Sequence, residues 1–325
     1  MAIQLIATGS ALPKRIVPNR ELENFIDTSD EWIYTHTGVR ERHIIENEET
    51  TVSLGTDAAK AALEMAGMQP DEVDLIVCST ITPDCEVPGC APRIRQLLGV
   101  TRDIPALDIN ANCTGCIYSL ATARGLMETL GLETALVIGS DTLSTITNWE
   151  DRGTCILFGD GAGAFILRRS EEEGILAVHI SGRNDDENVL VCNWPIPETP
   201  FYPAKTSMHT KLYMDGHKVF SFAVGALIDT IQYTLGQAGV EASALKAIVP
   251  HQANARIIKS TARRLDIPVE KFYMNVDRVG NTSSASVPIA LDELARSGGL
   301  QSGDLVLLAG FGGGLTYGSA LVRWK

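Results

Sequence analysis

Short apolar runs alternate with longer amphipathic stretches along almost the whole chain. The apolar runs predict strands at Leu75–Ser79, Ala106–Ile109, Ala135–Gly139, Ala164–Leu167, Ala247–Pro250, Leu305–Gly310 and Ser319–Arg323. The amphipathic stretches predict helices at Thr56–Met65, Gly115–Leu130, Phe222–Ala238, Ala253–Leu265 and Ser286–Arg296. Several predicted strands are apolar along their whole length, as expected where helices cover both faces of a sheet. The pattern is typical of an α/β protein with parallel strands joined by helices.

The pattern also recurs about halfway along the chain. The segment DEVDLIVCSTIT, from Asp71, resembles ASALKAIVPHQA, from Ala242. Downstream, a small-residue turn, a helix and a strand starting at Asn112 resemble those starting at Asn281. The offset is about 170 residues in both comparisons, which predicts two duplicated α/β halves. We expect the halves to span residues 1–170 and 171–325 and to form one compact unit.

Composition narrows the possible functions. Hydrophobic residues make up 45% of the 325 residues and charged residues 21%, the balance of a globular protein. The net charge of −13 argues against general binding to nucleic acid or to anionic membranes. The first residues lack a secretory leader, and no stretch is expected to approach the roughly 20 apolar residues of a membrane span. We therefore expect a cytosolic protein whose seven cysteines are thiols.

Cys113 is the first candidate for chemistry. It lies where a predicted strand passes through a tight turn into the helix that begins at Gly115. A thiol at a helix N-terminus has free N–H groups beside it, which favour the nucleophilic thiolate. A buried structural cysteine is the alternative. Cys113 and Cys116 also form a C-x-x-C, but no second one exists and Cys85 and Cys90 lack ligand spacing, so zinc is disfavoured. Helical spacing puts Cys116 one turn into the helix, where it is expected to be packed, so redox chemistry is disfavoured too.

Two further polar residues lie at comparable turns. His251 follows the predicted strand Ala247–Pro250, at a strand end where open α/β folds place ligands. Asn281 lies in a small-residue turn and, in the internal repeat, takes nearly the place that Cys113 holds. If the halves pack about a pseudo-twofold axis, the Cys, His and Asn side chains converge. Each could instead be structural when considered alone.

Glycine clusters and one long loop complete the candidates. Gly312–Gly314 would let the backbone approach a substrate and direct N–H groups at an oxyanion, or would form only a tight turn. Gly159–Gly163 does not match a dinucleotide-binding loop. The Pro- and aromatic-rich segment Asn184–Thr210 has no periodicity and is expected to be a flap, functional or merely an insertion.

Six segments together resemble β-ketoacyl-acyl-carrier-protein synthase III over essentially the whole chain. They are DTSDEWIYTHTGVRERHI from Asp27, NANCTGC, DRGTCILFGDGAGA, PHQANARI, GNTSSASVPIALDE and FGGGLTYGSALVRW. The resemblance implies a thiolase-like fold, in which duplicated βαβαβαββ halves form a five-layer αβαβα sandwich, and a homodimer. It also implies an acyltransferase of fatty acid biosynthesis.

The resemblance also implies roles for individual residues. Cys113 would be the nucleophile, with His251 and Asn281 as the other catalytic groups, Phe311 supporting decarboxylation and the Gly313 N–H serving as an oxyanion donor. Coenzyme A would be bound by Thr28, Trp32, His36, Arg152, Gly153 and Asn254, with Trp32 and Arg152 enclosing its adenine. The acyl pocket would include Val87, Leu143 and Phe158. A basic patch of Arg256, Lys259, Arg263 and Arg264 would dock acidic acyl carrier protein.

The reaction implied is ping-pong. An acyl-CoA primer acylates Cys113, and malonyl-acyl carrier protein then loses CO₂ and attacks the acyl group. Acyl-CoA and malonyl-acyl carrier protein are substrates, and no cofactor or metal is expected. Three residues depart from the family: His36 replaces an Arg, Cys116 a larger apolar residue, and Val87 a Phe that reaches across the dimer. The smaller Val87 is expected to admit a longer or branched primer.

Three other functions remain open from the sequence. A thiolase-fold relative of secondary metabolism would use a different acceptor. A hydrolase could use the same Cys, His and Asn, although the duplicated halves and the surroundings of Cys113 disfavour it. A non-catalytic acyl-CoA-binding protein would not need a nucleophile.

Overall fold

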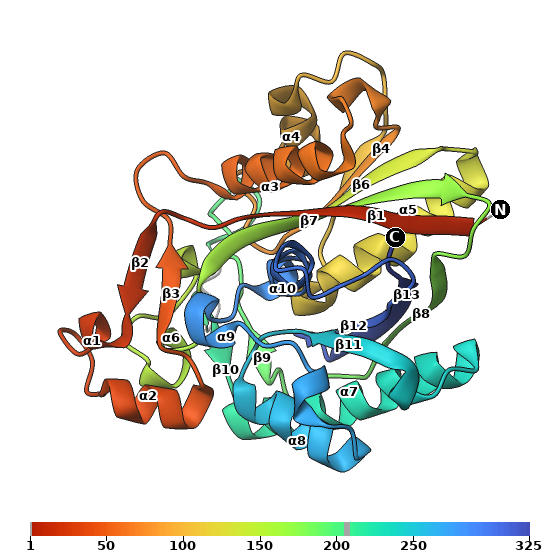
Figure 1. The fold of residues 1–325 in the computed structure, drawn as a ribbon. Coiled ribbons are helices and arrows are strands. Elements are labelled where there is room, and N and C mark those ends of the chain that lie inside the picture. The colour runs from red at the N-terminus through yellow and green to blue at the C-terminus, as the bar shows by residue number, and fades with distance from the viewer. Residues whose placement is uncertain (1, 205–208) are drawn as a thin grey trace.

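The computed structural model describes residues 2–204 and 209–325. It contains two large sheets that lie between layers of helices (Figure 1). The first sheet has the order β1-β7-β6-β4-β5, with β1 (Ala2–Ala11), β7 (Asp160–Ser170), β6 (Thr134–Thr142), β4 (Leu75–Ser79) and β5 (Ala106–Ile109). The second has the order β11-β12-β13-β8, with β11 (Leu245–Pro250), β12 (Leu305–Gly312), β13 (Thr316–Arg323) and β8 (Ile175–Gly182).

Helices fill the three layers around these sheets. Helices α3 (Thr51–Ala66) and α4 (Cys90–Leu98) cover the outer face of the first sheet, and α7 (Gly216–Ala238) and α8 (Ala255–Leu265) cover that of the second. Between the sheets lie α5 (Gly115–Leu130) and α10 (Ser286–Arg296) (Figure 1). The five-layer αβαβα thiolase-like sandwich expected from the resemblance is therefore confirmed.

Close packing between layers depends on small residues. A Cβ atom on Gly9 of β1 would lie 2.3 Å from the carbonyl oxygen of Ala58 in α3, so only glycine fits there. The alanine-rich face of α3 buries Ala58, Ala59 and Ala62 completely against this sheet. The apolar spacing of α3 that predicts a helix thus also lets it lie close to the strands.

The two halves share one topology. Strands β4, β6 and β7 correspond to β11, β12 and β13, and the counterpart of β5 is reduced to a single parallel bridge between Ile248 and Phe272. The chain passes from the first sheet to the second between Ser170 and Ile175. Helices α5 and α10, one from each half, pack in the same core, so the division at residue 170 stays an interpretation of the sequence.

The structure corrects the alignment of the internal repeat. A 3₁₀ turn precedes α5 at Asn112–Thr114, and another precedes α10 at Ser283–Ala285; the first residue of each has φ of 51°. The offset between these turns is 283 − 112 = 171 residues. The residue that corresponds to Cys113 is therefore Ser284. The alignment that starts the two turns at Asn112 and Asn281 is wrong by two residues, and Asn281 lies three residues before the place of Cys113, in the loop after α9 (Val276–Val279).

Agreement with the predicted elements is closest in the central layers. Predicted elements β4, β5, α5 and α10 match to the residue; α8 begins two residues later than predicted, and the others extend further than predicted. The sequence analysis missed the edge strands β1 and β8 and the helices α4 and α9. It also missed the peripheral elements β2 (Arg15–Pro18), α1 (Asn19–Leu22), α2 (Asp30–Thr37), β3 (Glu41–Ile44), α6 (Arg152–Cys155), β9 (Leu190–Val191) and β10 (Tyr213–Met214). The peripheral segments are short or polar, so their apolar periodicity is weak.

Helix α7 corrects one expectation about membranes. By length and composition it could cross a bilayer, because an 18-residue window has a mean hydropathy of 1.3. The expectation that no stretch approaches a membrane span is therefore wrong. In this fold the apolar face of α7, including Leu227 and Ile231, packs on the second sheet, which accounts for the hydropathy of the helix.

Candidate active site

A cavity of about 790 Å³ lies where the two halves meet, and Cys113, His251 and Asn281 all line it. Cys113 comes from the turn before α5, His251 from the end of β11, and Asn281 from the loop after α9. The structure therefore brings the three predicted catalytic residues together in the wall of one cavity. Apolar side chains make up much of the remaining surface, as is usual for sites that bind organic ligands.

Cys113 is half-buried, and its neighbour Cys116 is fully buried. Burial raises the pKa of the Cys113 thiol to about 12. The Ser283 hydroxyl and the Cys113 N–H favour the thiolate, whereas the buried Asp141 carboxylate disfavours it. Burial is the largest effect, so Cys113 rests as a thiol. The Cys113 N–H favours the thiolate, as the sequence analysis expects of a helix start, but burial outweighs this effect.

His251 is 1% exposed and extends the ladder of the second sheet, where its N–H donates to the Ala309 carbonyl at 2.8 Å. Its Nδ1 lies 2.5 Å from Ser286 Oγ, and its ring meets Phe311 edge-on with centroids 5.1 Å apart. Burial lowers the pKa of His251 to about 3. The imidazole is therefore neutral at physiological pH, with Nδ1 occupied by the serine.

Asn281 is held by backbone and side chain together. Its N–H donates to the Leu157 carbonyl at 2.8 Å, and its carbonyl accepts from the Gly159 N–H at 3.0 Å. Its Oδ1 accepts from the Ser283 N–H at 2.9 Å. This contact fixes the orientation of the amide, which leaves Nδ2 as the group available to donate.

Glycine allows the close approach that places Asn281. A Cβ atom on Gly159 would lie 2.4 Å from the Val279 carbonyl oxygen, so a larger residue would force the two segments apart. Arg42 holds the segment that leads to Gly159. It is a fully buried residue that the sequence analysis did not single out. Arg42 Nη2 donates to the Ile156 carbonyl at 2.9 Å, and burial lowers the pKa of Arg42 to about 10.

The glycine-rich turn after β12 packs directly on the nucleophile. A Cβ atom on Gly312 would lie 2.8 Å from Cys113 N, and both Phe311 and Gly312 line the cavity. Gly313 is not on the cavity wall; its carbonyl accepts from Asn112 Nδ2 at 3.1 Å. The predicted oxyanion donor at Gly313 therefore stays a prediction, supported by the anchoring of its peptide to the turn that carries Cys113.

An aromatic and cationic cluster forms one end of the cavity. The rings of Trp32 and His36 stack with centroids 4.3 Å apart, and His36 Nδ1 donates to the Trp32 carbonyl at 2.7 Å. The Arg152 guanidinium lies 4.5 Å from the Trp32 ring centre. A flat ring between Arg152 and Trp32 would need about 3.5–4 Å on each face. The pair must therefore separate before it can enclose an adenine.

Other predicted coenzyme A contacts divide into two groups. Gly153 and Asn254 line the cavity, whereas Thr28 and Arg152 do not. Asn254 is also structural: its Oδ1 caps α8 at the Arg256 N–H, 2.8 Å away, and its Nδ2 donates to the His36 carbonyl at 3.1 Å. This amide connects the C-terminal end of α2 to the start of α8. We call the part of the cavity wall formed by Trp32, His36, Gly153, Asn254 and Arg256 its mouth.

Leu143 and Phe158 of the predicted acyl pocket line the cavity. Val87 does not, and its side chain is 86% exposed. Within one chain Val87 is therefore not part of the pocket. The sequence analysis missed several apolar lining residues, namely Ile146, Ile156, Leu212, Met214, Phe220 and Phe222.

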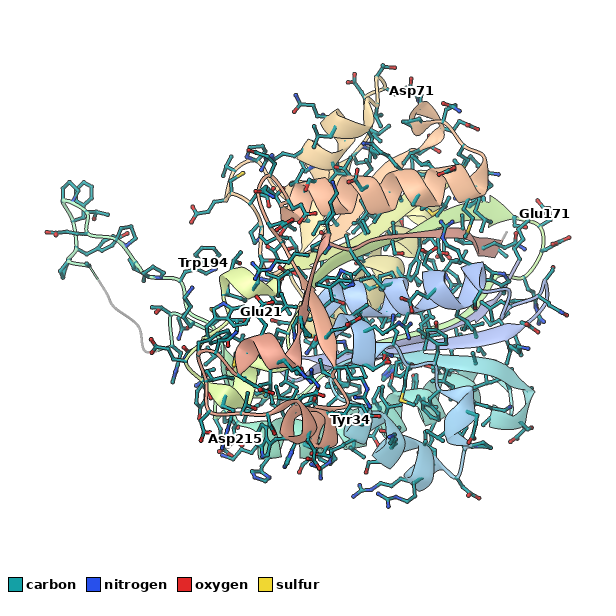
Figure 2. All side chains as sticks on the ribbon, turned by 60° about the vertical axis from the view of Figure 1, so that its left-hand side comes forward. Glu21, Tyr34, Asp71, Glu171, Trp194 and Asp215 are labelled. Carbon is teal, nitrogen blue, oxygen red and sulfur yellow. The ribbon has the colours of Figure 1, made fainter. Side chains whose placement is uncertain are left out.

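The predicted flap contributes to the cavity wall. Residues 190–195 and Thr210 line the cavity, and the residues after Trp194 project from the body (Figure 2). Residues 205–208 of the flap lie outside the described residues. The lack of periodicity in this segment was the only sequence signal for this wall.

The four predicted basic residues of α8 are exposed. Arg256 also lines the cavity mouth. Within the described residues, none of Arg256, Lys259, Arg263 and Arg264 takes part in an ion pair. A positive surface thus adjoins the mouth in a protein of net charge −13.

Comparisons with known proteins identify the family to which the chain belongs. Family models match at residues 107–184, for 3-oxoacyl-[acyl-carrier-protein (ACP)] synthase III, and at 235–324, for the C-terminal part of that enzyme. The chain is 44% identical over 322 residues to the β-ketoacyl-[acyl-carrier-protein] synthase III of Xanthomonas axonopodis pv. citri, covering 99% of this chain and 98% of that protein. It is 42% identical over 323 residues to the enzyme of Clostridium novyi, covering 99% of both.

A solved structure of 3-oxoacyl-[acyl-carrier-protein] synthase III from Aquifex aeolicus is also similar. It matches with a TM-score of 0.90 and 40% identity, covering 99% of this chain and 100% of that one. The similarity extends over both halves, and it therefore includes the segments of each half that line the cavity. The chain belongs to the β-ketoacyl-acyl-carrier-protein synthase III family and is a condensing acyltransferase of fatty acid synthesis.

Proposed function

We propose that the chain joins an acyl-CoA primer to malonyl-acyl carrier protein through an acyl-Cys113 intermediate, giving a β-ketoacyl-acyl carrier protein. One observation carries this proposal: a half-buried thiol shares a cavity with His251 and with an Asn281 amide whose Nδ2 donates to no group in the described part of the chain. Such a set suits charge that develops on a thioester oxygen. A peptide hydrolase would instead need its His to take a proton from the thiol.

The first half-reaction transfers the primer. The thiol of Cys113 attacks the thioester carbonyl, and coenzyme A leaves as its thiol after taking up the proton lost by Cys113. The N–H groups of Cys113 and Gly313 are proposed to hold the tetrahedral oxyanion. Because the pKa of Cys113 is raised to about 12, deprotonation should accompany attack rather than precede it.

The second half-reaction forms the carbon–carbon bond. The malonyl carboxylate leaves as CO₂, and its bonding electrons form an enolate on the thioester of the carrier protein. His251 Nε2 and Asn281 Nδ2 donate hydrogen bonds to that enolate oxygen, a contribution of roughly 3–4 kcal/mol for each such donor. The carbanion then attacks the acyl carbonyl and releases the Cys113 thiolate, which regains a proton. No metal or redox cofactor is needed, since CO₂ carries away the carboxyl group and donors hold the charge.

The two substrates are proposed to share one mouth. Trp32, His36, Arg152, Gly153 and Asn254 would hold coenzyme A, with Thr28 at the periphery. The α8 surface formed by Arg256, Lys259, Arg263 and Arg264 would dock the acidic carrier protein, as opposite charge speeds and orients encounter. Its position beside the mouth supports this assignment.

We further propose a cytosolic homodimer. Strand β5 is an edge of the first sheet and the Val87 side chain is 86% exposed, features that a second copy of the chain could cover. In that dimer Val87 would reach the partner's acyl pocket, where a small side chain admits longer or branched primers. All seven cysteines are free thiols, as expected in a reducing compartment.

Intact mass spectrometry tests the proposal. The protein is mixed with acyl-CoA primers of increasing length, and malonyl-acyl carrier protein is added afterwards. Acyl adducts that are absent in Cys113→Ala and are discharged as β-ketoacyl-carrier product support the proposal, and they identify the primer. Absence of loading from any primer would contradict it, and loading of acetyl-CoA alone would contradict the Val87 argument.

A further inference from the structure

We infer that Ser286 is a positioning residue that holds His251 in the tautomer with its proton on Nε2. The inference rests on the proposed role of His251 as a hydrogen-bond donor to the enolate. A neutral imidazole carries one N–H, so the donor can face the substrate only if Nδ1 accepts a hydrogen bond. The structure provides the hydroxyl that could supply it.

Ser286 is the first residue of α10 and is fully buried. Its Oγ lies 2.5 Å from His251 Nδ1 and accepts from the Gln252 N–H at 3.3 Å. A backbone N–H can only donate, so it uses a lone pair of the hydroxyl oxygen. The hydroxyl proton then needs an acceptor of its own.

Within the described residues, His251 Nδ1 is the acceptor that remains for this proton. Ser286 Oγ makes no other hydrogen bond there, either to a carbonyl or to a carboxylate. If the imidazole donated instead, the serine proton would be buried without a partner, which is unfavourable. The arrangement Gln252 N–H to Ser286 Oγ–H to His251 Nδ1 satisfies every donor.

The relay is rigid because Gln252 is itself fixed. Its Nε2 donates to the carbonyls of Pro250 and Tyr273, at 2.7 and 3.1 Å, and its Oε1 accepts from the Asn275 N–H at 3.1 Å. Gln252 is fully buried. The direction of its N–H toward Ser286 is therefore set by the backbone of β11 and of the segment that precedes α9.

The charge state supports the same assignment. Burial lowers the pKa of His251 to about 3, so the ring is neutral and one nitrogen must be an acceptor. A carboxylate in place of Ser286 would accept from Nδ1–H and leave Nε2 as a base. The Ser286 hydroxyl already accepts from the Gln252 N–H, so it donates to Nδ1 and leaves the proton of the imidazole on Nε2. The choice of serine thus suits a site that needs a donor rather than a base.

One short segment orients both donors. The Ser283 N–H directs the Asn281 amide, and Ser286, three residues later, directs His251. The 3₁₀ turn Ser283–Ala285 and the first residue of α10 thereby couple two side chains that come from different loops.

The tautomer can be measured directly in the full-length wild-type protein. Histidine labelled with ¹⁵N is incorporated, and the six histidines are resolved by long-range ¹H–¹⁵N correlation, with His251 assigned by its loss in His251→Asn. We expect His251 to carry its proton on Nε2 between pH 6 and 8. A proton on Nδ1, or an imidazolium in that range, would overturn the inference even if every variant failed to fold.

Partial reactions of Ser286→Ala test the catalytic consequence. We expect decarboxylative condensation to fall about 10- to 100-fold, less than the roughly 10⁴-fold loss for a fully misdirected His, while loading of Cys113 by acyl-CoA changes less than about threefold. Ser286→Thr keeps the hydroxyl and should recover most of the condensation. Ser119→Ala is the matched control, because Ser119 is a buried helical serine whose hydroxyl has no partner in the described residues.

The outcomes separate the inference from the proposed function. Unchanged condensation in Ser286→Ala, or an equal loss of loading and condensation that Thr does not rescue, would overturn the role of Ser286. Persistent loading of Cys113→Ala would instead overturn the proposed function, whichever nitrogen of His251 carries the proton.

Discussion

The carboxylate of Asp141 in the N-terminal half accepts two hydrogen bonds from Ser284 in the C-terminal half, from Oγ at 2.6 Å and from N at 3.0 Å. On its own side Asp141 accepts from Thr80 Oγ1 at 3.0 Å and from the Ile81 N–H at 2.7 Å. Ser284 is the structural counterpart of Cys113. A single buried anion thus joins the two related turns, and the catalytic wall is formed by both halves together.

Replacing this carboxylate should destabilise the fold. We expect Asp141→Ala to lower the free energy of unfolding by about 3 kcal/mol or more, because several buried donors would lose their acceptor at once. Urea unfolding at neutral pH measures the change, with Asp57→Ala on the exposed face of α3 as the control. A loss below about 1 kcal/mol would show that the carboxylate does not join the halves.

His251 should make stability depend on pH in the acid range. Its pKa is about 3 in the fold and about 6.5 in an unfolded chain. Between these values the unfolded state binds the proton more readily, so stability present above pH 6.5 is lost as the pH falls. At pH 5 this loss should reach about 2 kcal/mol.

The contribution of His251 to the pH dependence of stability is isolated by comparing wild type with His251→Asn. The free energy of unfolding of each protein is measured at pH 7.5 and at pH 5. The other histidines and the buried carboxylates are common to both proteins, so their contributions cancel. Wild type should lose more stability than the variant on acidification. Equal losses would mean that His251 takes up a proton in the folded state.

Cys113 should react slowly with alkylating agents at neutral pH. Since burial raises its pKa to about 12, its thiolate fraction should increase about tenfold for each pH unit from 7 to 9.5, without a plateau. Iodoacetamide labelling followed by peptide mass spectrometry gives the rate at Cys113 alone. The half-buried Cys85 provides an internal reference. A plateau below pH 9 would indicate a thiolate that the site stabilises at rest.

Reversing charge on α8 should affect one substrate only. We expect Lys259→Glu with Arg263→Glu to raise the KM for malonyl-acyl carrier protein about tenfold at low salt, with the difference shrinking as salt screens the surface. Loading by acyl-CoA should be unchanged, since neither residue lines the cavity. Lys60→Glu on α3, which reverses one exposed charge instead of two, is the control for a change in net charge. Equal effects on both substrates would place the carrier protein elsewhere.

The sequence was most informative where its apolar pattern is regular. Helices α5 and α10 and strands β4 and β5 were predicted to the residue. Helices α5 and α10 and strand β4 are buried along at least one face, and turn residues flank these elements. Edge strands β1 and β8 and the short elements around Trp32 were missed, since their partners are distant in the chain. The resemblance to the family named the nucleophile and its two partners, but the alignment of the internal repeat at Asn281 was wrong by two residues.

The sequence by itself determined a duplicated α/β chain, the residue types available for thioester chemistry, and the family. Only the tertiary structure decided the protonation states and the hydrogen-bond directions of those groups. Burial is the largest influence on the pKa of Cys113 and on that of His251, and burial depends on the packing of both halves. The donor directions of Asn281 and His251 likewise come from Ser283 and Ser286 through contacts of hydrogen-bond length. The order of residues along the chain does not predict these effects, because each depends on which atoms pack around the cavity and exclude water from it.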